Sequence, residues 1–313
     1  MRGVHSGRRG VGRGTNRGHV HAGVTTLAHF RGGRPRVAGG GQPKRFLGNN
    51  GERSRAFSVR PLAAGVGAEA LNLAVREERV SMLTEQLKKD LLRTAALFQR
   101  PIFTTALIAG DVVILDAMYR CGLLDRVPVV FIDTLHLFNE TLEFLEDCEA
   151  RYGFKALRYL PEGCEDRKDW NAKYASDLYM TDVDRYDQLA KVEPLNRALT
   201  ELEADAWING RRRDHGFDRA FLDVYEEGGA QFKMNVLAHW TFRDCWDYIE
   251  HNGVPAHPLH QDGYPSIGDL QSTLPVPKEK WFEYAGERSG RWSGEGKTEC
   301  GIHTFEKLRE EED

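Results

Sequence analysis

The sequence predicts an α/β fold in which a parallel sheet is covered by helices on both faces. Short continuous apolar runs alternate with longer segments whose apolar residues recur at helical spacing. Strands buried on both faces produce such runs, and parallel neighbours are joined through helices. The 313 residues are 41% hydrophobic with a mean hydropathy of −0.52, which suffices for a sizeable core. No apolar stretch approaches the roughly eighteen residues of a membrane span, so we expect no membrane partner.

The elements follow from spacing and from the residues that end them. A helix is predicted over residues 69–99, because leucine and valine recur at helical spacing until Pro101. Further helices are predicted at 111–121, 139–153, 197–202 and 241–253, and strands at 102–108, 127–132, 206–209 and 232–236. Gly153 and Gly253 end two of these helices, and Thr241 with Asp244 forms a near capping box. After Pro255 glycine, proline, histidine and aromatic residues predict a loop-rich segment.

Composition divides the chain into three parts. Residues 1–51 contain nine Arg, one Lys, no acid and 14 of the 32 glycines, so this segment offers too little apolar surface to fold. We expect a disordered Arg/Gly-rich leader over 1–60, an α/β nucleotide-binding domain over 61–254, and a loop-rich segment over 255–313 that ends in a mobile tail. If the leader is a transit peptide, the protein is expected in a plastid or mitochondrion. If it is a tail without a targeting role, or follows from a wrongly assigned start codon, the protein is expected in the cytoplasm. An Arg/Gly RNA-binding tail is a third interpretation of the leader.

The charge balance and the cysteines limit which partners and which kinds of site we expect. Beyond residue 51 the chain holds 33 basic and 47 acidic residues, a balance of −14, which argues against a nucleic-acid partner. Five cysteines form no CxxC pair and leave an odd one, so we expect reduced thiols and no metal site. Cys148 and Cys245 lie within predicted helices and are expected in the core. Cys300 lies in a polar tail beside Arg288, Arg291 and Lys297, where it is either an accessible thiolate nucleophile or an exposed spectator.

Polar residues gather where the predicted strands end. Ligands of open parallel sheets bind at the carboxyl ends of the strands. Hydroxyls, a helix N-terminus and arginines there suit a phosphorylated ligand. Alternatively, the threonines are turn residues and the arginines form a solvated face. The candidates at these ends are Thr104, Thr105, Gly110, Asp133, Thr134 and the arginines of 211–213.

Several motifs resemble one family. They are KTECGIH (297–303), GERSGRW (286–292), FIDTLH (131–136), YDQLAKVEPLNRAL (186–199) and GYPSIGD (263–269). Together they resemble the phosphoadenylyl-sulfate (PAPS) reductases of assimilatory sulfate reduction, and the fungal thioredoxin-dependent members most of all. The likeness runs from about residue 100 to residue 304. It implies an adenine-nucleotide α-hydrolase-like, Rossmann-like fold that binds PAPS over the strand ends.

The resemblance also implies a mechanism. In that family the tail cysteine, here Cys300, attacks the terminal sulfur of PAPS, and adenosine 3′,5′-bisphosphate leaves. Reduced thioredoxin then releases sulfite from the S-sulfocysteine, so thioredoxin is the expected partner, and a homodimer the expected assembly. Lys191, Arg288 and Arg291 would offset the substrate's negative charge, and His303 would orient the sulfonate or favour the thiolate. The resemblance also implies substrate binding by Tyr264, in the motif at 263–269, and by Arg219, which is retained from the string that binds the 3′-phosphate in relatives. Arg212 and Arg213, already candidates at a strand end, precede that string.

Departures from the family pattern bear on the substrate. Relatives that reduce adenylyl sulfate (APS) commonly hold a [4Fe-4S] cluster through four cysteines, and here those places are Tyr186, Asp187, Asp269 and Ser272. A thiolate-held cluster is therefore not expected, which favours PAPS. However, Leu107 replaces the phosphate-loop glycine, and Asp218 replaces a hydroxyl beside Arg219. A cluster-free APS reductase, a nucleotidyl-transfer or pyrophosphatase enzyme of the same fold, and a non-catalytic nucleotide-binding homologue remain as alternatives.

Overall fold

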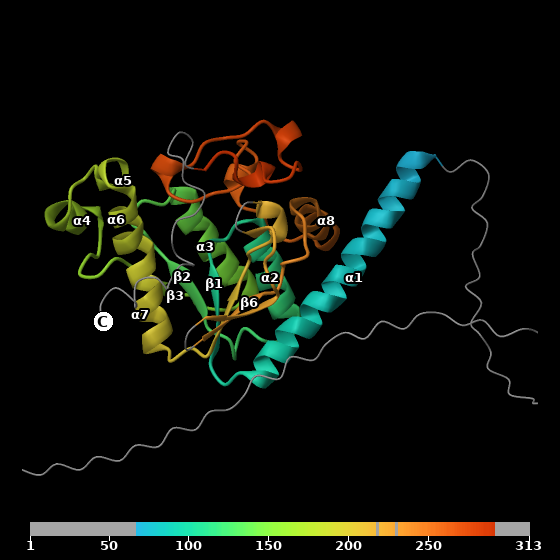
Figure 1. Ribbon diagram of the computed structural model, residues 1–313, viewed down its shortest axis with the longest axis horizontal. Helices are drawn as coiled ribbons and strands as arrows, with labels where there is room; N and C mark the ends of the chain where they lie inside the picture. Colours follow the sequence, from blue (N-terminus) through green and yellow to red (C-terminus); the bar gives the residue numbers. More distant parts are fainter. Residues whose placement is uncertain (1–66, 217–218, 229–230, 292–313) are drawn as a thin grey trace, which may run out of the picture. The chain divides into compact units, whose positions relative to one another are not determined.

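The computed structural model describes residues 67–216, 219–228 and 231–291. The predictions for the leader, the mobile tail, Asp218, Cys300 and His303 therefore lie outside the described residues. The described part is built on a six-stranded sheet with the order β3-β2-β1-β4-β6-β5 (Figure 1). Its strands are β1 (Pro101–Thr105), β2 (Val129–Ile132), β3 (Leu157–Tyr159), β4 (Ala206–Asn209), β5 (Tyr225–Gly228) and β6 (Gln231–Asn235).

The chain changes direction across the sheet at β1. From β1 it proceeds outward through β2 to β3, and it then returns to add β4 on the other side of β1. Phe103 of β1 is in register with Val129 of β2 and with Ile208 of β4, and both pairings are parallel. Only β5 runs antiparallel, at the edge beside β6. The carboxyl ends of β1 and β4 thus form a topological switch point, where ligands of such sheets bind.

Helices cover both faces of the sheet. Alternate strand residues such as Ile102, Val130 and Trp207 pack with α7 (Glu193–Glu201) on one face. The intervening residues, among them Phe103 and Ile208, face a larger cluster on the other side. The helices on that side are α1 (Ala68–Leu97), α2 (Ala109–Arg120), α3 (Asn139–Tyr152) and α8 (Phe242–Asn252). The two-residue period of the strands therefore divides the core into two layers.

The ends of α3 and α8 agree with the sequence predictions. Gly153 follows α3 with φ 68°, a left-handed conformation that glycine adopts without steric strain. At the start of α8, Thr241 Oγ1 accepts from Asp244 N at 3.1 Å and Asp244 Oδ2 accepts from Thr241 N at 2.7 Å. Cys148 and Cys245 are fully buried, as expected. Burial raises the pKa of Cys148 to about 12, so this thiol is not a nucleophile at neutral pH.

The structure differs from the predicted elements in several places. The first strand ends at Thr105 rather than at residue 108, because Leu107 has a left-handed φ of 59°. The helix predicted from residue 197 begins at Glu193 and continues a π turn over Gln188–Val192. The edge strands β3 and β5 were not predicted from the sequence. Neither were the short helices α4 (Arg167–Lys173), α5 (Leu178–Thr181) and α6 (Val183–Asp187).

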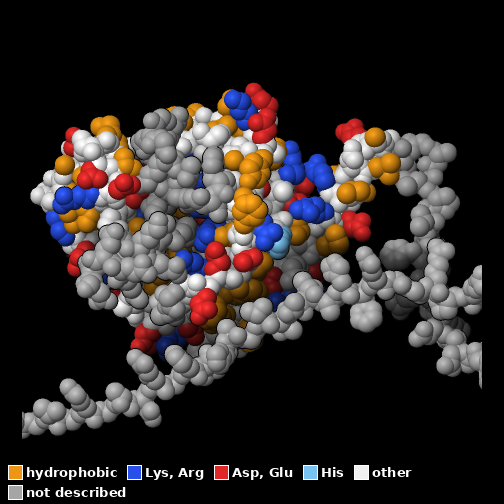
Figure 2. All heavy atoms as spheres, viewed as in Figure 1, with side chains coloured by type: hydrophobic (Ala, Val, Ile, Leu, Met, Phe, Trp, Pro, Cys, Tyr) orange, Lys and Arg blue, Asp and Glu red, His pale blue; other side chains and the backbone are white. Residues whose placement is uncertain are grey.

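Residues 255–291 form loops and short turns, as the composition predicts. Figure 1 shows this segment, in orange to red, beyond the carboxyl ends of the strands. An isolated bridge between Leu137 and Asp269 attaches it to the loop after β2, and a second bridge joins Thr273 to Arg291 within the segment. Figure 2 shows Lys and Arg side chains interspersed with Asp and Glu side chains on the face drawn. None of the helices in the described part has the length and apolar character needed to cross a membrane.

Candidate active site

A cavity of about 200 Å³ lies at the carboxyl ends of β1, β2 and β4. The segment 267–291 contributes its outer wall, so residues distant in the sequence converge there. Eight of the candidate residues line the cavity. These are Thr104, Thr105, Thr134, Lys191, Arg211, Arg219, Arg288 and Arg291.

The lining carries an excess of positive charge. Its cationic side chains are Lys191, Arg211, Arg219, Arg288 and Arg291. The carboxylates in the same lining belong to Asp111 and Asp269. Arg211 forms an ion pair of 3.0 Å with Glu226, which lies outside the cavity. An anionic ligand is therefore favoured over a cationic one.

Lys191 is held between two buried carboxylates. Its Nζ lies 2.6 Å from Asp187 Oδ1 and 2.7 Å from Asp269 Oδ2. Thr134 Oγ1 donates to Asp269 Oδ1 at 2.5 Å, so Asp269 fixes two predicted site residues at once. Burial by itself raises the pKa of Asp269, but Lys191, the Thr134 hydroxyl and Arg291 outweigh it and lower that pKa below its usual value.

The four positions that the family resemblance matched to cluster-binding cysteines lie close together here. Tyr186, Asp187, Asp269 and Ser272 line one small cavity, and Lys191 lines it too. An ammonium group and two carboxylates thus occupy this region of the protein. Within the described ranges, no group of three or more His, Cys, Asp or Glu side chains is arranged to hold a metal ion.

Side chains at the end of β1 and the start of α2 accept hydrogen bonds from the loop between them. Leu107 N donates to Thr105 Oγ1 at 3.0 Å, and Ala106 N donates to Asp111 Oδ2 at 2.6 Å. Leu107 adopts the left-handed conformation usual for glycine, and its side chain is fully buried. The loop therefore keeps a glycine-like backbone at Leu107 without a glycine. Both amides are thus already bonded to side chains of the flanking elements, whereas a glycine-rich loop would present its amides to a phosphate.

Arg212 was predicted to bind substrate, but it lies beneath the cavity. Its side chain is fully buried and forms ion pairs with Glu287 and with Asp214, the latter at 3.1 Å. His215 Nε2 lies 3.1 Å from the same Glu287 carboxylate. Burial and the surrounding guanidinium groups, that of Arg212 foremost, lower the pKa of His215 well below its usual value. This buried set fixes the segment that carries Arg288.

Four other predicted substrate-binding residues lie outside the cavity wall. Asp133 accepts from Arg158 Nε at 2.7 Å and from Leu135 N at 2.8 Å. Arg213 Nε donates to Leu222 O at 2.7 Å. The ring of Tyr264 packs against Phe138 with centroids 5.7 Å apart. A Cβ on Gly110 would lie 2.7 Å from Arg212 Nη1, so this glycine permits close packing.

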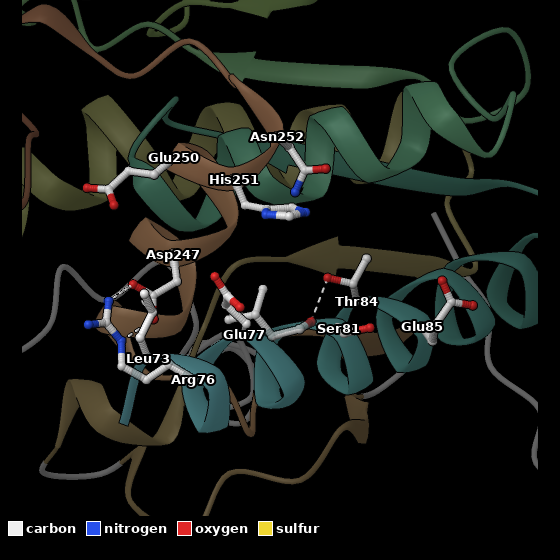
Figure 3. Close-up of a pocket in the computed structure, with 11 residues that line it drawn as sticks. Leu73, Arg76, Glu77, Ser81, Thr84, Glu85, Asp247, Glu250, His251 and Asn252 are labelled. Atoms are coloured by element: carbon white, nitrogen blue, oxygen red, sulfur yellow. Dashed lines mark hydrogen bonds and ion pairs between the residues drawn. The ribbon is translucent and has the colours of Figure 1, made fainter. Parts of the chain in front are cut away.

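A larger hollow of about 540 Å³ lies between α1 and α8 (Figure 3). Figure 3 shows Arg76 of α1 bonded to Asp247 of α8, so the cation in this lining is already paired. The remaining acids of the lining are Glu77, Glu85 and Glu250. This hollow therefore suits an anionic nucleotide less well than the cavity at the strand ends.

Comparison with known proteins identifies the family. Residues 101–275 match the phosphoadenosine phosphosulfate reductase domain. The chain belongs to this family. The family predicted from the sequence motifs is thus confirmed. The described reductase domain carries the strand ends, the loop after β1 and most of the cavity wall, whereas Arg288 and Arg291 follow the matched range.

Curated relatives include fungal proteins. The chain is 39% identical to phosphoadenosine phosphosulfate reductase of Emericella nidulans, over 64% of this chain and 65% of that protein. Identity is 38% to the Saccharomyces cerevisiae protein of the same name, over 74% of this chain and 92% of that protein. It is also 38% to the probable reductase of Schizosaccharomyces pombe, over 71% and 82% of the two chains.

Solved structures confirm the predicted fold class. The crystal structure of PAPS reductase from Candida auris, a phosphate complex, matches with a TM-score of 0.55 and 33% identity, over 63% of this chain and 97% of that chain. FMN adenylyltransferase of Candida glabrata in complex with ATP matches with a TM-score of 0.50 and 19% identity, over 75% and 82% of the two chains. The second likeness concerns the fold alone.

Sequence reasoning missed several residues that shape this reductase site. Asp111 closes the loop after β1, Trp207 Nε1 donates to Thr104 Oγ1 at 2.5 Å, and Glu287 pairs with Arg212. Only Asp111 carried a local signal, as an acid at the start of the helix predicted over 111–121. The partners of the other two lie 103 and 75 residues away, so no local pattern could reveal them.

Proposed function

We propose that this chain reduces PAPS to sulfite and adenosine 3′,5′-bisphosphate in sulfate assimilation, as an oxidoreductase that uses reduced thioredoxin. The observation that supports it most is the cationic cavity at the switch point of a member of this family. Arg288 and Arg291 line that cavity and directly precede the tail that carries Cys300. The names of the relatives support the same reaction.

The reaction proceeds in two displacements. The Cys300 thiolate forms a bond to the terminal sulfur of PAPS, and the bond from that sulfur to the bridging oxygen breaks. The electron pair leaves with the phosphate, which gives adenosine 3′,5′-bisphosphate and an S-sulfocysteine. A thioredoxin thiolate then attacks the Cys300 sulfur, and sulfite leaves with the electron pair of the S–S bond. The second thioredoxin thiol resolves the mixed disulfide, so the dithiol supplies both electrons.

The cavity residues have separate roles in this proposal. Lys191, Arg288 and Arg291 offset the charge that develops on the leaving phosphate, in a site where burial strengthens electrostatic interactions. Arg219, Thr104, Thr105 and Thr134 bind the rest of the nucleotide. His303 orients the sulfonate or favours the Cys300 thiolate. Cys300 follows Arg291 by nine residues, a length that extends to about 30 Å at most.

The assembly and location complete the proposal. The family resemblance supports a homodimer and supports a site that needs no iron–sulfur cluster. Residues 1–60 determine the compartment: a transit peptide there directs the enzyme to a plastid or mitochondrion, and otherwise it is cytoplasmic.

Replacing the nucleophile tests the mechanism. We expect Cys300→Ser to abolish sulfite release from PAPS with reduced thioredoxin, because a serine hydroxyl is not ionised at neutral pH. Binding of adenosine 3′,5′-bisphosphate should persist. The matched control is Cys121→Ser, which replaces a half-buried cysteine of the reductase domain and should leave turnover unchanged. Undiminished sulfite release by the Cys300 variant would refute the mechanism.

Offering PAPS and APS in parallel tests the substrate. Faster turnover of PAPS is expected because the cavity carries more cations than carboxylates and PAPS has one phosphate more than APS. Faster turnover of APS would instead identify a cluster-free APS reductase. Nucleotide binding without turnover of either substrate would identify a non-catalytic homologue.

A further inference from the structure

Asp111 is a buried carboxylate in the wall of the cationic cavity. It lies in the first turn of α2, and only 6% of its surface is exposed. Its Oδ2 accepts from Ala106 N at 2.6 Å, which fixes the loop after β1. A Cβ on Gly210 would lie within 2.4 Å of Asp111 Oδ1, so the end of β4 also closes over this carboxyl group. The carboxyl group is thus enclosed by the two strand ends of the switch point.

Few charges neutralise Asp111 directly. Arg212 favours its ionised form, but Glu287, which is paired with Arg212, opposes that effect. The other titratable groups of the surrounding walls are Lys191, Arg211, His215, Arg219, Asp269, Arg288 and Arg291. His215 is neutral at pH 7, because burial and its cationic neighbours disfavour its charged form.

An ionised Asp111 opposes any anionic ligand in this cavity. Two negative charges repel strongly where protein excludes water, and the repulsion disappears when the carboxyl group takes up a proton. The hydrogen bond from Ala106 N remains possible in both states, because the unprotonated oxygen still accepts. Protonation therefore removes the repulsion without breaking the loop.

We propose that Asp111 sets the affinity of this cavity for its anionic ligand, by taking up one proton when the ligand binds. This inference rests on the proposed function only in taking the ligand to be a nucleotide with several phosphate charges. A purely structural role, as an acid that caps α2, would stabilise the helix but would not couple proton uptake to binding.

The direction of the pH effect follows from linkage. Burial raises the pKa of Asp111 to about 7, and a bound anion raises it further. Well below pH 7 the carboxyl group is already protonated, so it contributes no pH dependence to binding. Above pH 7 the dissociation constant should rise, approaching tenfold per pH unit, until the pH reaches the pKa of the complex.

The experiment is calorimetric binding of adenosine 3′,5′-bisphosphate to the full-length chain between pH 6 and pH 9. Each titration is made in two buffers of different ionisation enthalpy, which gives the number of protons taken up. Asp111→Asn keeps an oxygen acceptor for Ala106 N but cannot ionise. Asp116→Asn is the matched control, since Asp116 is equally buried in α2 but bonds Arg120 and Tyr248 instead.

We expect wild type and the Asp116 variant to take up about one more proton near pH 8 than the Asp111 variant does. The phosphates of the ligand titrate alike in all three proteins, so their contribution cancels. At pH 8.5 the Asp111 variant should bind at least about tenfold more tightly than wild type, and at pH 6 equally. Equal pH profiles in the three proteins would overturn the inference but leave the proposed function standing.

A second measurement uses wild type alone, in case the Asp111 variant does not fold. An infrared difference spectrum on ligand binding should gain the C=O band of a protonated carboxyl group at pH 8. Ligand binding without that band overturns the inference. Absence of nucleotide binding by wild type would overturn the proposed function together with it.

Discussion

Asp269 shows how a single side chain organises the site. It comes from the loop-rich segment after α8, yet it bonds Thr134 beyond β2 and Lys191 beyond α6. All three residues are nine-tenths or more buried, so their charges and hydrogen bonds must be satisfied by one another. Asp269 thereby joins three parts of the chain at the cavity wall.

Replacing Asp269 should therefore destabilise the protein and disorganise the site. We expect Asp269→Asn to lower the free energy of unfolding by about 2–3 kcal/mol, because a charge-assisted bond to buried Lys191 is weakened. Urea denaturation measures this loss. The control Glu85→Gln removes an exposed, solvent-screened pair with Lys88 and should change stability far less. Equal effects of the two variants would contradict a stabilising role for Asp269.

Asp269 should also make the free energy of unfolding depend on pH. The folded protein holds the pKa of Asp269 below its usual value. Its stabilising contribution is therefore fully present above the unfolded pKa near 4, and it is lost as the pH falls through the folded pKa. In urea denaturation at successive pH values, wild type should lose stability more steeply below pH 4 than the Asp269→Asn variant does.

For single residues, the sequence indicated cavity-lining positions well where a family motif contains them. It did so less well where a distant partner determines the direction of the side chain. Lys191, Arg288 and Arg291 came from family motifs, and all three line the cavity. Arg212 came from an arginine triplet, but the triplet could not show that Glu287 would bury it. A side chain's direction depends on contacts across the fold, which local spacing does not encode.

Among the elements, α8 illustrates a prediction that local chemistry determines. Thr241 and Asp244 lie three residues apart, and their side chains bond each other's backbone amides. Such a capping box satisfies amide groups that the first helical turn leaves unpaired. The sequence alone was therefore enough to place this end of the helix.

Removing the cap should weaken α8 measurably. We expect Thr241→Ala to lower the free energy of unfolding by about 1 kcal/mol, as seen for N-cap threonines in general. The control Thr200→Ala removes an exposed hydroxyl that bonds Asn196 O within α7, and should have a smaller effect. Thermal unfolding of both variants measures the difference. Thr241 does not line the cavity, so nucleotide affinity should stay unchanged, and a marked loss would contradict this placement.

The strands divide by position in the sheet. β1, β2 and β4 are buried on both faces, and their continuous apolar runs revealed them. β3 and β5 lie at the two edges, and their exposed and half-buried residues carry little apolar pattern. The sequence predicted that α7 begins at residue 197, whereas it begins at Glu193. The π turn before it interrupts the helical period.

At the scale of the whole molecule, one buried ion pair joins the C-terminal segment to the sheet. Glu287 of the last described turn pairs with Arg212, and both side chains are almost completely enclosed. Close packing supports the pair, since a Cβ on Gly286 would lie 1.9 Å from Lys280 O. The position of Arg288 and Arg291 at the cavity depends on this connection.

Breaking the pair should release the segment. We expect Glu287→Gln to lower the free energy of unfolding by about 3 kcal/mol, because Arg212 then keeps only Asp214 as a charged partner. Chemical denaturation measures the loss. Limited proteolysis should also cut within residues 278–291 sooner than in wild type. The exposed control is Glu279→Gln, and a Glu287 variant as stable and as resistant as this control would contradict the connection.

The fold class was predictable as a whole because strands and helices alternate from about residue 69 to residue 253. The location of the site at one edge of the sheet was predictable, since the switch point follows from topology. The contacts inside the site were not predictable, because Asp111, Asp269 and Glu287 contact segments that only the fold brings together.

The two edge strands have a consequence for self-association. β3 has three residues and β5 has four, and β5 presents Glu226 and Glu227. Short, charged edges are poor templates for pairing with the strand of another molecule. The sheet is therefore protected against edge-to-edge aggregation. A dimer of this reductase would have to form through helices and loops, and its assembly would leave the sheet of each copy complete in itself.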